Sequence, residues 1–230
     1  MAAGLGILIS AAAVPSRAEA GCFFGRSCRP GSGGSGGGQC FLKGTRILTT
    51  RGEIEVEKLE PGDLVQTLDG PARGIKRIVS WDAKRKDGED WIDDVAPIVI
   101  RRSALAQNIP HRDLYVSPRH SLYIDGMLFV ANSLVNGRSI ARCSKYDTET
   151  LSYFHVELDE HLVIYAEGAA TESLLAEGMK PLAPTWFGGR RAELASRLRS
   201  AASPWIERRI PADMLRDQLE ARALNWPRAA

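Results

Sequence analysis

The chain has 230 residues and a mass of 25.1 kDa, which is enough for one hydrophobic core with a short appendage. Hydrophobic residues make up 44% and charged residues 25%, which is typical of a globular protein and excludes a wholly disordered chain. The net charge of +2 provides no basic excess for binding nucleic acid. No apolar run reaches the ~20 residues of a membrane-spanning helix, and the 4 cysteines are too few for a disulfide scaffold.

The N-terminus resembles a secretory signal. An apolar stretch from Ala2 to Val14 precedes Ala18-Glu19-Ala20, which matches the A-x-A pattern of signal-peptide cleavage. We therefore expect residues 1–20 to be a signal peptide and the protein to be secreted or periplasmic. The alternative is a misassigned start codon, because Lys and Arg are missing at the start of the chain.

Residues 21–39 have the composition of a linker. The run Gly31–Gln39 consists of Gly and Ser apart from its last residue and cannot bury enough apolar area to fold. We expect a flexible N-terminal segment here. Cys22 and Cys28, which precede the run, could close a small disulfide loop or remain unpaired.

From Cys40 onward, short runs rich in β-branched and aromatic residues alternate with Gly, Pro and Asp turn signals. This pattern predicts an all-β unit, with a helical turn at Ile54–Leu59 and at Ala131–Val135. The predicted strands are residues 46–50, 63–68, 74–81, 97–101, 114–116, 121–124, 127–130, 153–158 and 161–166.

An internal repeat supports a pseudo-twofold architecture. Six residues, in the order Leu, Gly, Val, Leu, Gly and Val, occur again later in the chain in the same order, with Ile replacing the last Val. Because six positions agree in order, chance is the weaker explanation. The first set is Leu48, Gly52, Val56, Leu59, Gly62 and Val65, and the second is Leu122, Gly126, Val130, Leu134, Gly137 and Ile140.

Residues 176–230 form a different, basic unit. Leucines recur at helical spacing at Leu194 and Leu198 and again at Leu215 and Leu219, and Pro211 fits the first position of a helix. We predict a short C-terminal helical extension docked on the β unit. A lipid-binding surface is the alternative, which the narrow Leu stripe and the scattered arginines disfavour.

Cys40 is the most informative residue, because it lies where the flexible segment ends and the predicted fold begins. A thiol at the first residue of a domain can attack the carbonyl of the preceding residue, here Gln39. The product of this N–S acyl shift is a thioester with a free amine. The alternative is an ordinary buried cysteine.

Six segments between residues 40 and 175 form a series of motifs: Cys40–Ile47 (CFLKGTRI), Val56–Val65 (VEKLEPGDLV), Val116–His120 (VSPRH), Leu134–Gly137 (LVNG), Tyr153–His161 (YFHVELDEH) and Ala166–Ser173 (AEGAATES). Together they resemble the Hint domain, the module shared by hedgehog autoprocessing domains and inteins, in its bacterial branch. The resemblance covers roughly residues 40–175 and implies an all-β horseshoe with a pseudo-twofold axis.

The resemblance implies autocatalytic cleavage at Gln39–Cys40, in a single turnover, with the chain's own N-terminal segment as substrate. His120 would protonate the departing nitrogen of Cys40, and Ser117, in place of the family Thr, would hydrogen-bond that amide or hold the imidazole. The thioester would then pass to water or to another small nucleophile. No cofactor and no metal are expected.

Two further histidines, His155 and His161, are interpreted as structural residues that bond to the backbone. Alternation along a strand would place His155, Glu157 and Asp159 on one face, but no zinc-binding motif supports a metal site there. Cys143 lies outside any motif and is interpreted as a buried thiol.

Departures from the family leave alternatives open. No His-Asn pair follows Ser173, so the sequence favours cleavage without splicing. Gln39 stands where hedgehog proteins have Gly, which leaves a catalytically inactive Hint-fold module, acting in binding or secretion, as the second hypothesis. A multiple-turnover thiol hydrolase is a third and weaker one.

Overall fold

A computed structural model describes residues 38–85, 88–175, 185–186 and 211–226 of the chain, with the backbone alone described at 185–186 and 211–212. These residues belong to one unit that spans 37–230. The predicted signal peptide, the linker up to residue 37 and the Leu194–Leu198 repeat lie outside the described residues. No helix among the described residues is long and apolar enough to cross a membrane.

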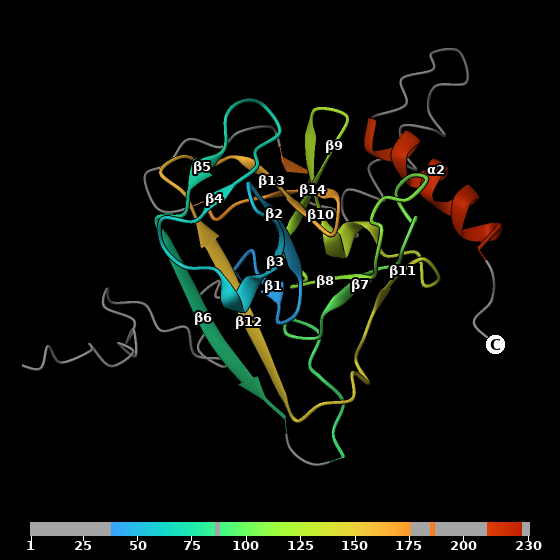
Figure 1. Cartoon of the computed structure of the whole chain (residues 1–230). Coiled ribbons are helices and arrows are strands. Elements are labelled where there is room, and N and C mark those ends of the chain that lie inside the picture. Colours follow the sequence, from blue (N-terminus) through green and yellow to red (C-terminus); the bar gives the residue numbers. More distant parts are fainter. Residues whose placement is uncertain (1–37, 86–87, 176–184, 187–210, 227–230) are drawn as a thin grey trace, which may run out of the picture. The chain divides into compact units, whose positions relative to one another are not determined.

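The first of two sheets has six strands in the order β11-β7-β8-β1-β12-β6. Its two longest members, β6 and β12, pair antiparallel over their whole length and run side by side in Figure 1. The short strand β1 lies between β8 and β12 and pairs antiparallel with both. The strands are β1 (Phe41–Leu42), β6 (Arg77–Lys84), β7 (Ile98–Ile100), β8 (Leu114–Val116), β11 (Ile140–Arg142) and β12 (Thr150–Glu157).

The second sheet runs in the order β15-β10-β9-β14-β13-β2-β4-β5, with β3 paired to β2. Its pairings are antiparallel except that of β15 with β10, which is parallel. The sequence did not predict β15, which lies in the basic extension. The strands are β2 (Arg46–Thr49), β3 (Gly52–Glu55), β4 (Leu64–Val65), β5 (Arg73–Gly74), β9 (Ser121–Ile124), β10 (Met127–Val130), β13 (Val163–Ala166), β14 (Ala169–Glu172) and β15 (Thr185–Trp186).

The internal repeat appears as two copies of one unit. Each copy is a hairpin followed by a 3₁₀ turn: β2–β3 leads into η1 (Val56–Lys58), and β9–β10 leads into η2 (Ala131–Leu134). Gly52 and Gly126 occupy equivalent hairpin turns at φ of 99° and 83°, a region that favours glycine. The predicted helical turn at 54–59 is shorter than expected, because residues 54 and 55 belong to β3.

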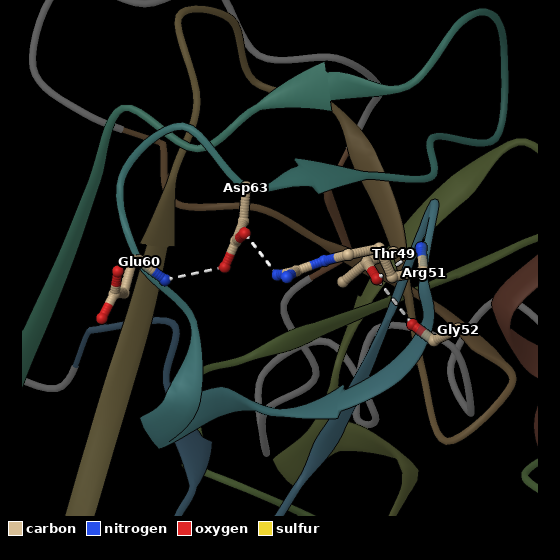
Figure 2. A network of polar contacts seen from close by, with 5 residues as sticks. All are labelled: Thr49, Arg51, Gly52, Glu60 and Asp63. Carbon is tan, nitrogen blue, oxygen red and sulfur yellow. Dashed lines mark hydrogen bonds and ion pairs between the residues drawn. The ribbon is translucent and has the colours of Figure 1, made fainter.

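A polar network fixes the turn of the β2–β3 hairpin (Figure 2). The Thr49 hydroxyl donates to the Gly52 carbonyl and accepts from the Arg51 amide. The Arg51 guanidinium lies 2.5 Å from Asp63, which also accepts a hydrogen bond from the Glu60 amide. The hairpin turn is therefore tied to the loop that precedes β4.

Alternating strand residues form two hydrophobic clusters. The larger cluster contains Ile47, Leu122 and Ile164, which are fully buried. The smaller one surrounds Cys40 and includes Trp91 and Tyr153. The prediction of an all-β unit is confirmed, since strands and short 3₁₀ turns account for the regular structure described between residues 38 and 175.

Helix α2 (Pro211–Leu224) begins at the proline that the sequence placed at its first position. Leu215 and Leu219, one turn apart, are buried in the larger cluster, and the Arg216 guanidinium donates to the Ser133 carbonyl. The predicted docking of a C-terminal helix by its Leu stripe is confirmed for α2.

Removal of the Tyr153 hydroxyl tests how much one buried hydrogen bond in the smaller cluster contributes to stability. Its side chain is fully buried and its hydroxyl donates a hydrogen bond of 2.6 Å to the Val95 carbonyl. We expect Tyr153→Phe to lower the free energy of unfolding by about 1–3 kcal/mol, because the buried carbonyl loses its partner. Urea denaturation in a Cys40→Ala background, which keeps the chain intact, measures this change.

Tyr123→Phe is the matched control, because the Tyr123 side chain is only partly buried. Its free energy of unfolding should stay within about 0.5 kcal/mol of the parent. Equal effects of the two substitutions would contradict the role given to the Tyr153 hydroxyl.

Candidate active site

Strand register places two polar side chains on either side of Cys40. In β1, Phe41 pairs with Val116 of β8 on one side and with Phe154 of β12 on the other. In antiparallel strands, the residue before Phe41 therefore lies opposite the residue after each partner. Those residues are Ser117 and His155, so backbone pairing brings Ser117 to the backbone of Cys40 and His155 to its thiol.

Ser117 holds the backbone around the Gln39–Cys40 peptide. Its amide donates to the Cys40 carbonyl over 2.9 Å. Its hydroxyl accepts from the Cys40 amide at 3.0 Å and donates to the Gly38 carbonyl at 2.7 Å. The nitrogen that would leave in a cleavage reaction is thus fixed by one hydroxyl.

His155 contacts both partners of the proposed reaction. Its Nε2 lies 2.9 Å from the Cys40 sulfur, and its Nδ1 lies 2.8 Å from the Gln39 carbonyl oxygen. A carbonyl oxygen can only accept, so Nδ1 carries the hydrogen in this arrangement. The neutral ring then presents a lone pair at Nε2 to the thiol.

The charge state of His155 follows from its surroundings. Burial lowers the pKa of His155 below its usual 6.5, although the hydrogen bond to the Gln39 backbone acts in the opposite direction. The ring is therefore neutral at pH 7, the state in which Nε2 can accept a proton.

The Cys40 sulfur lies in a nearly water-free environment. Its side chain is fully buried in the smaller cluster. The Trp81 indole, which stacks on Tyr153 with 4.9 Å between ring centroids, donates its N–H to the sulfur at 3.3 Å. An N–H donor at this position stabilises a thiolate that burial alone would disfavour.

His120 is fully buried and tilts against Phe41, with ring centroids 4.4 Å apart. A tight turn fixes its position, because its amide donates to the Ser117 carbonyl and Pro118 follows Ser117. Its ring nitrogens make no hydrogen bond of normal geometry to the described residues. Burial lowers the pKa of His120 to about 4, while Glu172 and the nearby Gln39 backbone act to raise it.

The two residues before Cys40 are held in place as well. The Gln39 side-chain oxygen accepts from the Leu175 amide at 3.3 Å. Gly38 lies so close to His155 that a Cβ added there would approach the ring carbon Cε1 to 2.2 Å. The segment therefore enters the site as backbone, with no room for a side chain at position 38.

The structure thus brings together Gln39, Cys40 and Ser117, with His120 beside the Gln39 backbone. His155 makes the backbone contact expected of a structural histidine, through Nδ1 and the Gln39 carbonyl, and its Nε2 also contacts the thiol, which the sequence did not predict. Trp81 was also missed, since an isolated Trp in a strand carries no sequence signal of a contact 41 residues away.

Two other residues, His161 and Cys143, were interpreted as a structural histidine bonded to the backbone and as a buried thiol. His161 is buried with its Nε2 3.3 Å from Glu172, consistent with a structural role. Cys143 is a free, partly buried thiol. Of the described residues, only Glu53, His111 and Glu167 form a group with metal-like spacing, and that group excludes Cys40.

Comparison with solved structures finds intein folds at low identity. The MchDnaB-1 intein is 15% identical, with 56% of this chain and 98% of that chain covered and a TM-score of 0.40. A DnaB intein from Synechocystis sp. PCC 6803 is 11% identical, covering 59% and 99% with a TM-score of 0.40. A bacterial intein-like domain from Clostridium thermocellum is 14% identical, covering 59% and 98%, also at 0.40.

No curated protein sequence matches significantly. The sequence profile described as "Hint domain" matches residues 39–178, which is more than half of the chain and includes Cys40, Ser117, His120 and His155. The fold agrees with this match, since it is built from antiparallel sheets with one C-terminal helix among the described residues. The chain therefore belongs to the Hint domain family, whose general activity is self-processing.

Proposed function

We propose that this protein cleaves its own backbone at Gln39–Cys40 by an N–S acyl shift, without splicing. The substrate is the chain's own N-terminal segment, and each molecule reacts once. The observation that carries this proposal is the placement of His155, which contacts the Cys40 sulfur through one ring nitrogen and the Gln39 carbonyl oxygen through the other.

His155 acts as the general base for the thiol. Its Nε2 takes the proton from Cys40, and the sulfur then attacks the carbonyl carbon of Gln39. A C–S bond forms, the C–N bond of the peptide breaks, and the α-amine of Cys40 leaves. A thioester between Gln39 and Cys40 remains.

The same imidazole stabilises the charge that develops. Its Nδ1–H already donates to the Gln39 oxygen, which becomes the oxyanion of the tetrahedral intermediate. After accepting the thiol proton, the ring is cationic and donates from both nitrogens, so this hydrogen bond strengthens as the reaction proceeds. Burial of the site further increases its strength.

The departing nitrogen needs a proton, and His120 is the proposed donor. With a pKa of about 4, only about one His120 in a thousand is protonated at pH 7 in the resting state. The proton that His155 takes from Cys40 must therefore be passed on to the amine, through His120, while the reaction is under way. The negative charge of the oxyanion assists this step because it raises the pKa of the neighbouring imidazole rings. Ser117 holds the nitrogen in place during this transfer.

The thioester is then released by water, or by another small nucleophile, which frees the thiol of Cys40 and the carboxyl group of Gln39. We also propose that the protein is exported. Removal of residues 1–20 by a signal peptidase would make the freed product Gly21–Gln39, a short peptide that contains Cys22 and Cys28.

Replacement of the base tests the mechanism. We expect His155→Asn to slow cleavage by at least about 100-fold, because a positioned general base contributes 10²–10⁴-fold. Cys40→Ala should abolish cleavage. Intact-mass spectrometry over time, with hydroxylamine to release the thioester, detects the two fragments that end at Gln39 and begin at Cys40.

Cys143→Ala is the control, since this second free thiol lies outside the site and should cleave at the wild-type rate. A wild-type chain that stays uncut with hydroxylamine or added thiol would refute self-cleavage. That outcome would favour the inactive binding or secretion module.

The pH dependence follows from the lowered pKa of His155. The neutral ring is the reactive form, so the single-turnover rate should rise as pH increases toward 6.5 and level off above pH 7. Rapid dilution of protein refolded at low pH into buffers between pH 5 and 8 measures this profile. A rate that instead declines with increasing pH across this range would show that a pre-protonated imidazole is required.

Gly38 tests the fit of the substrate backbone. The methyl group of Gly38→Ala would lie 2.2 Å from Cε1 and 2.7 Å from Nε2 of His155, so the ring must move. We expect cleavage to slow by about 100-fold, as for other ~1 Å misplacements, with an unchanged melting temperature. Gly74→Ala is the matched control, because an added Cβ there meets nothing within 4 Å and should cleave normally.

A further inference from the structure

Three side chains from distant parts of the sequence converge on one point. Glu53 comes from β3, His111 from the segment before β8, and Glu167 from the turn between β13 and β14. His111 Nε2 lies 3.1 Å from one Glu53 oxygen and 3.6 Å from Glu167 Oε2. One ligand atom from each of the three lies within 4.8 Å of the others.

The backbone fixes each member of this cluster. The network in Figure 2 ties down the hairpin turn that immediately precedes Glu53. The His111 amide donates to the Glu167 carbonyl at 2.9 Å, and the Arg46 amide donates to Glu167 Oε1 at 2.8 Å. Gly168 lies against the far side of the His111 ring, since a Cβ added at Gly168 would lie 2.6 Å from Nδ1. The three side chains are therefore preorganised.

Glu167 supplies the observation that points to a ligand. Its side chain is 3% exposed, and its Oε2, which faces His111, has no hydrogen-bond partner among the described residues. A buried carboxylate oxygen without a partner is costly unless a cation neutralises it. Burial raises the pKa of Glu167, consistent with the lack of a strong positive partner in this state.

We propose that Glu53, His111 and Glu167 bind a divalent transition-metal ion, with Zn²⁺ the best match. Ligand atoms held about 2.1 Å from one metal lie about 3.0–3.4 Å apart, close to the separations between His111 and the two carboxylates. A small shift of the Glu167 side chain closes the longer gap.

The donor set selects the class of ion. Imidazole nitrogen favours zinc and its neighbours over Ca²⁺ and Mg²⁺, which prefer sites made only of oxygen. Glu53 and His111 are each about a quarter exposed, so an ion can enter from solvent and retain a water ligand. Burial raises the pKa of Glu167, whereas the Arg46 amide hydrogen bond and the charge of Arg112 lower it, so Arg112 is a positive group that an ion would have to tolerate.

A bound ion would join two parts of the second sheet to the segment that leads into β8 of the first sheet. β3, the segment before β8 and the β13–β14 turn are otherwise joined here by a few hydrogen bonds. Binding should therefore stabilise the folded chain, because an ion that binds only the folded state raises the melting temperature. This inference does not depend on the proposed cleavage.

The test uses the full chain with its four cysteines replaced by alanine, so that no thiol binds metal and no cleavage occurs. After chelator treatment, Zn²⁺ is titrated by calorimetry and thermal unfolding. We expect one high-affinity ion per chain and a rise in melting temperature of about 5–10 °C at 100 times Kd. Glu53→Gln and His111→Asn should each weaken binding at least about 10-fold.

Glu60→Gln is the matched control, because it removes the same charge from an exposed position near η1 and should bind Zn²⁺ normally. The absence of a zinc-dependent shift, or an equal shift in the Glu53→Gln, His111→Asn and Glu60→Gln proteins, would overturn the proposal. The unliganded melting temperature of each variant separates loss of binding from loss of folding.

Discussion

The chemistry proposed for this protein depends on one imidazole that touches two atoms. His155 reaches the Cys40 sulfur with Nε2 and the Gln39 oxygen with Nδ1, so one ring can remove the thiol proton and stabilise the charge that results. The tautomer is set by the carbonyl, which can only accept. Most other features of the site maintain this arrangement, including the glycine at position 38, which leaves space for the ring.

Burial lowers the pKa of both histidines near Cys40, with opposite consequences for the proposed reaction. For His155, a lowered pKa keeps the ring neutral and basic at pH 7. For His120, a pKa of about 4 removes the resting supply of protons that the departing amine requires. In the proposed reaction, the resting charge states therefore favour nucleophilic attack, whereas leaving-group protonation depends on charge that appears only as the reaction proceeds.

Much of the architecture could be predicted from the sequence. The strands at 114–116, 121–124 and 127–130 were predicted with correct bounds, because period-two alternation and Gly turns determine such hairpins locally. The two-residue strand β1 was missed, since so short a strand has no periodicity of its own. β14 was also missed, because Ala169 and Ala170 lack the β-branched residues that mark a strand.

The site was predictable only where local motifs describe it. Cys40, Ser117 and His120 were identified from sequence motifs. His155 and Trp81 approach the thiol because β12 and β6 have a particular register, which no local pattern specifies. The cluster of Glu53, His111 and Glu167 arises in the same way, from segments more than 50 residues apart.

The register of β1 also bears on the time at which the reaction can start. Successive strand residues point to opposite faces, so a slip of one residue would turn Cys40 away from His155. The two residues are 115 positions apart, so Cys40 is synthesised well before His155. An incomplete chain therefore lacks the proposed catalytic pair, and cleavage by this route would have to await the synthesis and pairing of the central strands.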